Sequence, residues 1–233
     1  MTFQRARSDE QREVRRRVIL DTAAAMLREM PAAELSLNEL SRRVGLAKSN
    51  VLRYFESREA VLLELLEHEI HGWVDDVAAE LAAEDRRGPV AERADRLAAV
   101  LATTLQHRPV LCDLVAAQPA VLEHNTSVET VLRFKRSTRD HLAAVTTSAR
   151  QLLPELGPTA GQLCLMSVVI AGALSAQSQC SPSALAAYEI EPELAALRLD
   201  LPAALEDTIK TLTAGILARS RAHHPTSAAC RTH

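Results

Sequence analysis

The fold is decided by residues 36–61, which read SLNELSRRVGLAKSNVLRYFESREAV. Ser36 followed three residues later by Glu39 is a capping-box pattern, which predicts the start of a helix. Gly45 predicts the end of that helix, because glycine adopts the left-handed conformation that terminates helices at little cost. A second short helix is then expected over residues 47–54. Two short helices joined at a glycine, with a third helix before them, are typical of a helix-turn-helix unit.

The helix before this unit is predicted from its apolar spacing. We expect it over about residues 9–30, with Pro31 at its end. The residues that precede it, including Arg5 and Arg7, are expected to form a flexible arm. Its buried face repeats at helical intervals and consists of Ile19, Ala23, Met26, Leu27 and Met30.

The rest of the chain predicts further helices separated by prolines, and therefore an all-α fold. Ser57 is expected to cap a long helix over about 57–84, and the segment 181–201 is expected to hold a short helix or an ordered loop. Other helices are expected at about 90–107, 109–118, 127–152, 159–180 and 203–221. The domains would be an N-terminal helix-turn-helix domain (1–56), a C-terminal helical domain (57–222) and a disordered tail (223–233).

Composition agrees with a packed helical protein. Hydrophobic residues make up 47% of the chain and charged residues 24%, and only seven glycines are present. Residues 1–60 carry twelve Lys/Arg and nine Asp/Glu, a balance of +3, whereas residues 61–233 carry fifteen and twenty-one, a balance of −6. A basic N-terminal part on an acidic body favours a surface for nucleic acid at one end only.

Cysteine spacing and hydropathy favour a cytoplasmic protein without a membrane partner. The four cysteines, at positions 112, 164, 180 and 230, show no CxxC spacing, so free thiols in a reducing compartment are expected. The N-terminus has no apolar segment of the secretory kind. The longest apolar run, residues 163–176, is shorter than the about 20 residues that a membrane span needs.

The second short helix carries side chains suited to DNA. In a helix-turn-helix unit this helix enters the major groove and its first residues reach base edges. Asn50 can pair with adenine in a bidentate way, and Lys48 and Arg53 supply positive charge. Ser36, Tyr54 and Arg58 are suited to phosphate. The expected DNA-binding residues are Ser36, Arg43, Lys48, Ser49, Asn50, Arg53, Tyr54 and Arg58.

These motifs resemble the DNA-binding region of the TetR family of bacterial transcriptional regulators. The resemblance covers about residues 10–66, with Gly45 at the turn, Tyr54 and Phe55 before the break, and the Ser57–Arg58 pair opening the next helix. Beyond that region only the number, length and order of the helices agree.

Three positions depart from the family pattern. The family often has Gly-Thr or Gly-Ser where this chain has Ser49 and Asn50, and tyrosine where it has Leu52. Loss of that tyrosine could remove one phosphate contact, and Asn50 could change the base that is read. The operator sequence is therefore expected to differ from those of other members.

The resemblance implies a ligand-responsive regulator, most simply a repressor, that binds a palindromic double-stranded operator as an Ω-shaped homodimer. It also implies a four-helix dimer interface from the last two long helices and a pocket for a small-molecule effector in the C-terminal domain. Small residues in 159–180 and an apolar stripe in 203–221 are compatible with that interface and favour it over the alternative that both helices are only intramolecular core. The candidate effector-binding residues, each of which could also be ordinary core or surface, are His71, Trp73, His107, Cys112, Gln118, Phe134, Met166 and Gln177.

Other functions receive less support. His68 and His71 lie one helical turn apart and could hold a metal, but no third ligand is visible nearby, so a surface or pocket pair is the favoured interpretation. No nucleophile elbow or Gly-rich phosphate loop indicates an enzyme. We therefore expect no catalytic residue, cofactor or metal. The main alternative is a helical small-molecule-binding protein without specific DNA binding.

Overall fold

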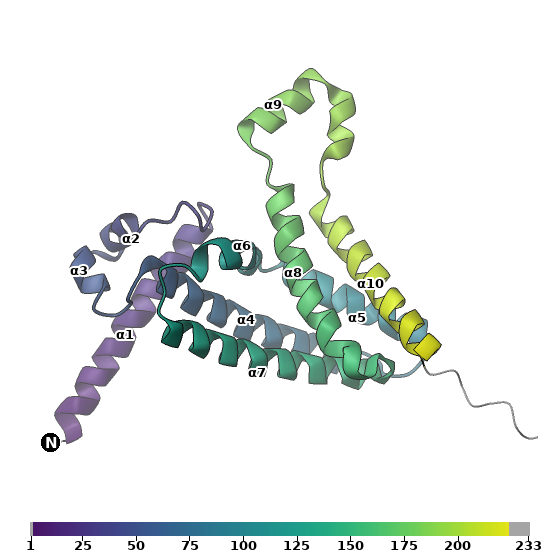
Figure 1. Cartoon of the computed structure of the whole chain (residues 1–233), viewed down its shortest axis with the longest axis horizontal. Coiled ribbons are helices and arrows are strands. Elements are labelled where there is room, and N and C mark those ends of the chain that lie inside the picture. Colours follow the sequence, from purple (N-terminus) through teal and green to yellow (C-terminus); the bar gives the residue numbers. More distant parts are fainter. Residues whose placement is uncertain (1, 224–233) are drawn as a thin grey trace, which may run out of the picture.

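The computed structural model describes residues 2–223, with side chains described for residues 10–220, and every regular element in this range is a helix (Figure 1). The expected all-α fold is confirmed. The N-terminal part consists of α1 (Thr2–Leu27), α2 (Leu37–Val44) and α3 (Lys48–Val51). The C-terminal part contains α4 (Arg58–Ala83), α5 (Val90–Gln106), α6 (Pro109–Ala117), the π-helical turn η1 (Gln118–Leu122), α7 (Val128–Leu152), the 3₁₀ segment η2 (Pro154–Thr159), α8 (Ala160–Ser178), α9 (Pro182–Ile190), the 3₁₀ segment η3 (Pro192–Leu197) and α10 (Leu201–His223).

Helix boundaries follow the local chemistry of the sequence. Ser57 caps α4 by accepting a hydrogen bond from the amide of Ala60 at 3.1 Å. Gly45 ends α2 at φ 74° and ψ 28°, in the left-handed region where a side chain is disfavoured. The amide of Leu46 then donates to the carbonyl of Ser41 at 3.0 Å, which closes the turn in the Schellman manner.

Only half of the capping box at α2 is formed. The hydroxyl of Ser36 accepts from the amide of Glu39 at 3.2 Å, as expected. The carboxylate of Glu39 instead accepts from Arg42 at 2.6 Å and from Arg43 at 3.0 Å. These hydrogen bonds, that with Arg42 foremost, lower the pKa of Glu39 to about 2. The two arginines thus replace the reciprocal bond because they lie three and four residues further along the same helix face.

Three expected boundaries were wrong. Helix α1 begins at Thr2, so the residues expected to form a flexible arm are helical. It ends at Leu27, before the expected end near residue 30. Helix α3 covers only Lys48–Val51, and residues 52–54 continue as a turn. The carbonyls of Arg53 and Tyr54 in this turn accept hydrogen bonds from Arg12 and Arg16 on α1. Of the tail expected over 223–233, His223 is the last residue of α10, and the rest, with His224 and Cys230, lies outside the described residues.

The C-terminal part is a layered helical bundle. Helix α4 packs along α7, α10 packs along α5, and α6 packs on α8. Helices α6 and α8 approach closely at Gly172, where an added Cβ would lie 2.9 Å from a methyl group of Val115 and 3.2 Å from the carbonyl of Cys112. Any larger residue at position 172 would therefore force the two helices apart.

Helix α8 is unusually apolar. The segment formed by η2 and α8 is long and apolar enough to cross a membrane, and core helices of soluble proteins share both properties. Its outward face shows Leu165 and Val169 to solvent, although the opposite face, including Leu163 and Cys164, is fully buried. Part of the apolar surface of α8 therefore stays exposed in a single copy of the chain.

The segment 181–201 folds as a helical arm. It contains α9 and η3, which pack on each other and stand away from the bundle between the ends of α8 and α10 (Figure 1). Neither element contains a buried residue. The alternatives of a short helix or an ordered loop are resolved in favour of two short helical pieces.

Candidate functional site

The exposed face of α3 and the turn after it groups the residues expected to read DNA. Lys48, Ser49 and Asn50 form the first turn of α3, and Arg53 lies in the turn that follows α3. None of these four side chains makes a hydrogen bond or ion pair with another described residue, and all four are exposed. Four adjacent polar side chains without internal partners are available to a ligand outside the chain.

Buried apolar residues hold this short helix in place. Val51 is fully buried and Phe55, four residues further along the chain, is nearly so. They join a core formed with Ile19, Leu40 and Leu62 from α1, α2 and α4. A four-residue helix has no stability of its own, so this packing determines its orientation.

Arg16 on α1 ties the end of the α3 turn to the rest of the molecule. Its guanidinium donates to the carbonyl of Tyr54 at 2.5 Å and lies 4.4 Å from the centre of the Phe55 ring. The same guanidinium forms a salt bridge with Glu64 on α4. The two charged side chains are only 21% and 17% exposed, so the contact is partly shielded from water. One arginine therefore joins α1, the α3 turn and α4.

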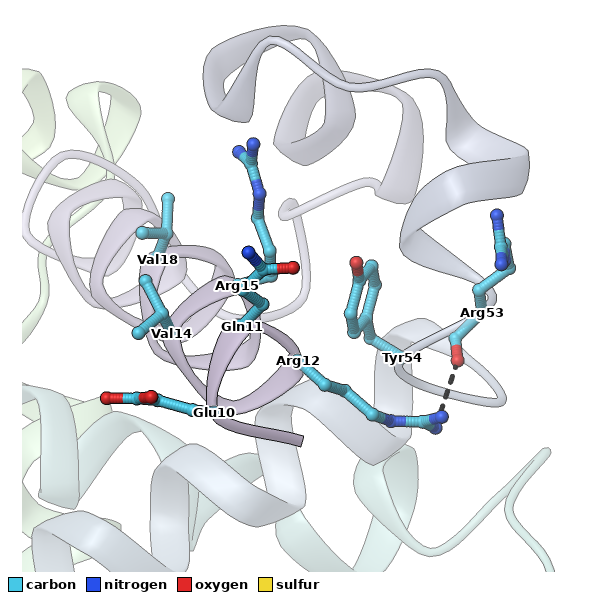
Figure 2. Close-up of a pocket in the computed structure, with 8 residues that line it drawn as sticks. All are labelled: Glu10, Gln11, Arg12, Val14, Arg15, Val18, Arg53 and Tyr54. Atoms are coloured by element: carbon cyan, nitrogen blue, oxygen red, sulfur yellow. Dashed lines mark hydrogen bonds between the residues drawn. The ribbon is translucent and has the colours of Figure 1, made fainter. Parts of the chain in front are cut away.

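A basic hollow lies between α1 and the α3 turn (Figure 2). It has a volume of about 780 Å³ and is open to solvent. Arg12 reaches across it to donate to the carbonyl of Arg53 at 3.3 Å, and its guanidinium lies 6.0 Å from the Tyr54 ring centre. Arg15 lines the same hollow. The hollow extends the positive surface of α3 onto α1.

The remaining expected DNA-binding residues have partners inside the chain. Ser36 caps α2, and Arg43 pairs with Glu29 at 2.6 Å and with Glu39. Arg58 donates to the carbonyl of Leu35 at 3.0 Å, which fastens the α1–α2 loop to the start of α4. Their DNA-binding role stays a prediction, and for Arg58 the structure adds a role in holding that loop.

Two hydrogen-bonded contacts link the N-terminal part to α6 and α7. The carboxylate of Asp113 on α6 accepts from the amide of Ala32 at 2.7 Å. Burial raises the pKa of Asp113, and the bond from Ala32 opposes that rise. The carboxylate of Glu56 accepts from both the amide and the hydroxyl of Ser127, the residue that caps α7, at 2.8 and 3.0 Å. Movements of α6 and α7 can therefore reach the DNA-facing helices without passing along α4.

Glu56→Ala is expected to lower the free energy of unfolding by about 1 kcal/mol at neutral pH, the usual size for an exposed charged hydrogen bond. Hydrogen bonding from Ser127, its backbone amide first, lowers the pKa of Glu56 from the ordinary 4.5. A lowered carboxyl pKa stabilises the fold above 4.5 and loses that contribution as pH falls through the lowered value. The difference between wild type and variant should therefore shrink in acid.

Urea unfolding at neutral pH and below pH 4.5 measures this difference, with Glu34→Ala as a control at an exposed glutamate of the same part of the chain. A difference that stays constant with pH would show that Glu56 does not act through its charge.

The expected effector-binding residues do not converge on one cavity. Trp73, Cys112 and Phe134 are buried on α4, α6 and α7, respectively. His107 and Gln177 are exposed at helix ends, and Met166 is half-buried. Gln118 begins η1 and donates to Glu123 at 2.7 Å. Burial raises the pKa of the Cys112 thiol to about 11, so this side chain is a neutral core group. As a binding set, these residues stay a prediction.

A small apolar cavity lies between α4, α7 and α8. Its volume is about 50 Å³, and Trp73 is the member of the expected set that lines it. The Trp73 indole donates to the hydroxyl of Thr104 at 3.0 Å, so its polar edge is already satisfied. Ligand pockets usually measure about 300–1,000 Å³, so a drug-sized effector would require α4, α7 and α8 to separate. Further residues that line the cavity are Ile70, Val74, Thr138, His141, Leu142, Val145, Cys164, Leu165 and Val168.

A histidine pair lies at the rim of this cavity. Nδ1 of His71 on α4 is 3.3 Å from Nε2 of His141 on α7, and Nε2 of His71 is 3.5 Å from a carboxylate oxygen of Asp75. Burial, with a further contribution from His71, lowers the pKa of His141. His68, the other histidine of the sequence motif, is exposed. Among the described residues no three His, Cys, Asp or Glu side chains are placed to hold one metal ion.

Comparison with protein-family models matches both parts of the chain. Residues 19–65 match the model of bacterial regulatory proteins of the tetR family, and residues 67–220 match the model of the tetracyclin repressor-like C-terminal domain. The chain belongs to the TetR family. The second match covers most of the chain, so membership does not depend on the helix-turn-helix alone.

Relatives of this TetR-family chain occur in mycobacteria. The HTH-type transcriptional regulator Rv1255c of Mycobacterium tuberculosis is 26% identical over 140 residues, which are 60% of this chain and 62% of the relative. The HTH-type transcriptional regulator EthR of the same organism is 36% identical over 67 residues, which are 29% of this chain and 30% of EthR. The matches thus span less than two thirds of each relative's length.

Solved structures show the same TetR fold. A tetR-family transcriptional regulator from Streptomyces coelicolor superposes with a TM-score of 0.53 at 18% identity, covering 91% of this chain and 83% of that one. The fatty acid degradation regulator FadR from Bacillus halodurans gives a TM-score of 0.50 at 15% identity, covering 85% and 93%. At these identities the likeness concerns the fold alone.

Sequence reasoning missed the residues that hold the TetR-type helix-turn-helix against its surroundings. Arg16 and Glu64 lie 48 positions apart, and Ala32 and Asp113 lie 81 apart. No local spacing rule connects such pairs. The one available signal was local spacing: Arg16 lies three and seven residues before the buried Ile19 and Ala23, so the helical period places it toward the same face.

Proposed function

We propose that this protein is a ligand-responsive transcriptional regulator that binds a palindromic operator as a homodimer and represses transcription until a small molecule releases it. The observation that carries the proposal is the group of four exposed, internally unpaired side chains on the α3 surface. Packing of Val51 and Phe55, together with Arg16, fixes this group in one orientation. The protein acts as a regulator and not as an enzyme. It works in the cytoplasm, without a membrane partner.

DNA contacts divide by the chemistry of the side chains. Asn50 offers both an amide donor and an acceptor, which suits an adenine edge in the major groove. Lys48 and Arg53 supply charge to bases or phosphates. Arg12 and Arg15 at the basic hollow extend the phosphate-binding surface onto α1. The first turn of α3 therefore carries sequence readout, and α1 carries affinity.

The dimer surface is formed by the outward faces of α8 and α10. Val169 is exposed on α8, and Gly215 on α10 has open space where a Cβ would stand. Apolar and small side chains on two adjacent helices suit a self-complementary contact with a second copy. Two copies place two α3 helices on one DNA, which explains the expected palindrome.

Effector binding would use the cavity between α4, α7 and α8. Opening this cavity displaces α7, and the Glu56–Ser127 contact transmits the displacement to the start of α4. An effector releases DNA only to the extent that it binds the displaced state more tightly.

DNase footprinting on DNA that flanks the chain's own gene tests the DNA-binding proposal. We expect one protected palindrome with two half-sites about one or more helical turns apart. Binding that is equally tight to unrelated DNA at physiological salt would favour the alternative of a helical protein without specific DNA binding.

Trp73 fluorescence tests the effector proposal. Trp73 is the chain's single tryptophan and is 2% exposed, so opening of the cavity should shift its emission to longer wavelength. A library of small apolar molecules is screened for compounds that both shift the emission and release the operator. A compound that releases DNA without changing the emission would place the effector elsewhere.

A further inference from the structure

The helical arm of residues 182–197 exposes apolar side chains that nothing in its own chain covers. Ile190 is 80% exposed and Leu197 is 75% exposed, and Leu185 is also exposed. Short helices are marginal in water and normally gain their stability from tertiary packing. An arm of ordered helices whose apolar side chains are exposed is therefore suited to contact with another molecule.

A groove on the first half of α7 has complementary chemistry. It is lined by Val128, Leu132, Arg133 and Arg136, with Glu129 also at its wall, and has a volume of about 520 Å³. Val128 is 77% exposed and Leu132 is 47% exposed. The groove therefore presents an apolar floor beside two arginines, neither of which forms an ion pair with a described residue.

The arm carries the opposite charge next to its apolar tips. Glu189, Glu191 and Glu193 flank Ile190, and none of the three makes an ion pair within the described chain. The arm and the groove are therefore complementary. Both present apolar side chains, and the arm is acidic where the groove is basic. Charge complementarity of this kind sets the orientation of a contact, whereas the apolar side chains supply affinity.

The arm and the groove of one copy cannot meet. Figure 1 shows the arm beyond the C-terminal end of α8, on the side away from α7, with α6 lying between the arm and the start of α7. A second copy can bring its groove to this arm, and two-fold symmetry then pairs the second arm with the first groove.

We propose that the arm of residues 182–197 clasps a second copy of this chain by placing Ile190 and Leu197 in the α7 groove of that copy. This contact rests on the homodimer of the proposed function and adds an exchanged clasp to it. Because the groove adjoins Ser127, which contacts Glu56, the clasp places one copy's arm beside the other copy's link to its DNA-facing helices.

Sedimentation equilibrium of the full chain tests the clasp. The double variant Ile190→Glu with Leu197→Glu should raise the dimer dissociation constant at least about a hundredfold, because four apolar contacts are lost per dimer. Both residues are exposed in the single copy, so the fold itself should be unaffected. The matched control is Val14→Glu with Val18→Glu, two exposed valines of α1, which should leave the constant unchanged.

The outcomes separate the clasp from the dimer. A monomeric wild type at micromolar concentration would overturn the proposed homodimer and the clasp together. A dimeric wild type whose arm variant dimerises equally well would overturn the clasp alone.

A charge exchange tests the assignment of the groove. Arg133→Glu with Arg136→Glu should weaken the dimer about tenfold, and adding Glu189→Arg with Glu193→Arg should restore most of the loss. If the arm variants weaken the dimer and the charge exchange restores nothing, the arm binds a different surface and the groove assignment is wrong.

Discussion

Replacing Lys48, Asn50 and Arg53 together by alanine is expected to lower operator affinity at least about a hundredfold, while the fold remains intact. Each well-formed contact to a base edge contributes about 1–3 kcal/mol, so the loss of several contacts amounts to two or more powers of ten. Stability should hardly change because none of these side chains has a partner within the described chain. Fluorescence anisotropy with the footprinted operator measures the affinity, and calorimetry checks the fold.

A variant with the same loss of charge controls for simple electrostatics. Arg139→Ala with Arg150→Ala removes two exposed positive charges from α7, as the triple variant removes two from the α3 surface. This control should change operator affinity only slightly. An unchanged footprint in the triple variant would mean that another surface reads the operator.

Arg16→Ala is expected to lower the free energy of unfolding by about 2–3 kcal/mol and to weaken operator binding as well. The substitution leaves the Glu64 carboxylate partly buried without its cation and removes the donor to the Tyr54 carbonyl. Removal of one partner from a fully buried pair costs about 3–5 kcal/mol, and partial exposure reduces that figure. Urea unfolding gives the stability, and the same anisotropy assay gives the DNA affinity.

Arg12→Ala provides the matched comparison, because Arg12 lies one helical turn earlier on the same face. Its contacts are longer, at 3.3 Å to the Arg53 carbonyl and 6.0 Å to the Tyr54 ring centre, and it is exposed. We expect a loss of stability below about 1 kcal/mol. The double variant Arg16→Ala with Glu64→Ala should be less destabilised than the sum of the two single variants, since neither charge is then left alone. Equal effects of Arg12→Ala and Arg16→Ala would refute the special role of Arg16.

The helix-turn-helix could be predicted because its determinants are local. The Ser36 cap and the Gly45 turn each act within five residues, and the spacing of Val51 and Phe55 defines a buried face directly. The exposure of Lys48, Ser49 and Asn50 follows from the same helical period. This part of the candidate site therefore needed no tertiary information.

The candidate effector site could not be predicted in the same way. Trp73, one of the candidate effector-binding residues, lines the cavity, whereas His141, which lies beside His71, was not among the candidates. These two histidines lie 70 positions apart on helices that meet only in the folded bundle. Residue type suggests which side chains suit a pocket, whereas helix packing decides which of them share one.

The sequence alone determined an all-helical chain that resembles the TetR family, the glycine turn that leads into α3 and the side chains that α3 exposes, because caps, glycine turns and apolar periods act over a few residues. The end of α3 was not determined in this way. Only the tertiary structure decided that Arg16 braces the α3 turn, that Arg58 holds the α1–α2 loop, and that Glu56 is joined to the start of α7. It also showed that residues 182–197 leave the bundle with their apolar tips uncovered. These features depend on contacts between residues that are far apart in the sequence. Local spacing cannot predict them, because only the packing of the helices decides which charged and apolar side chains find partners.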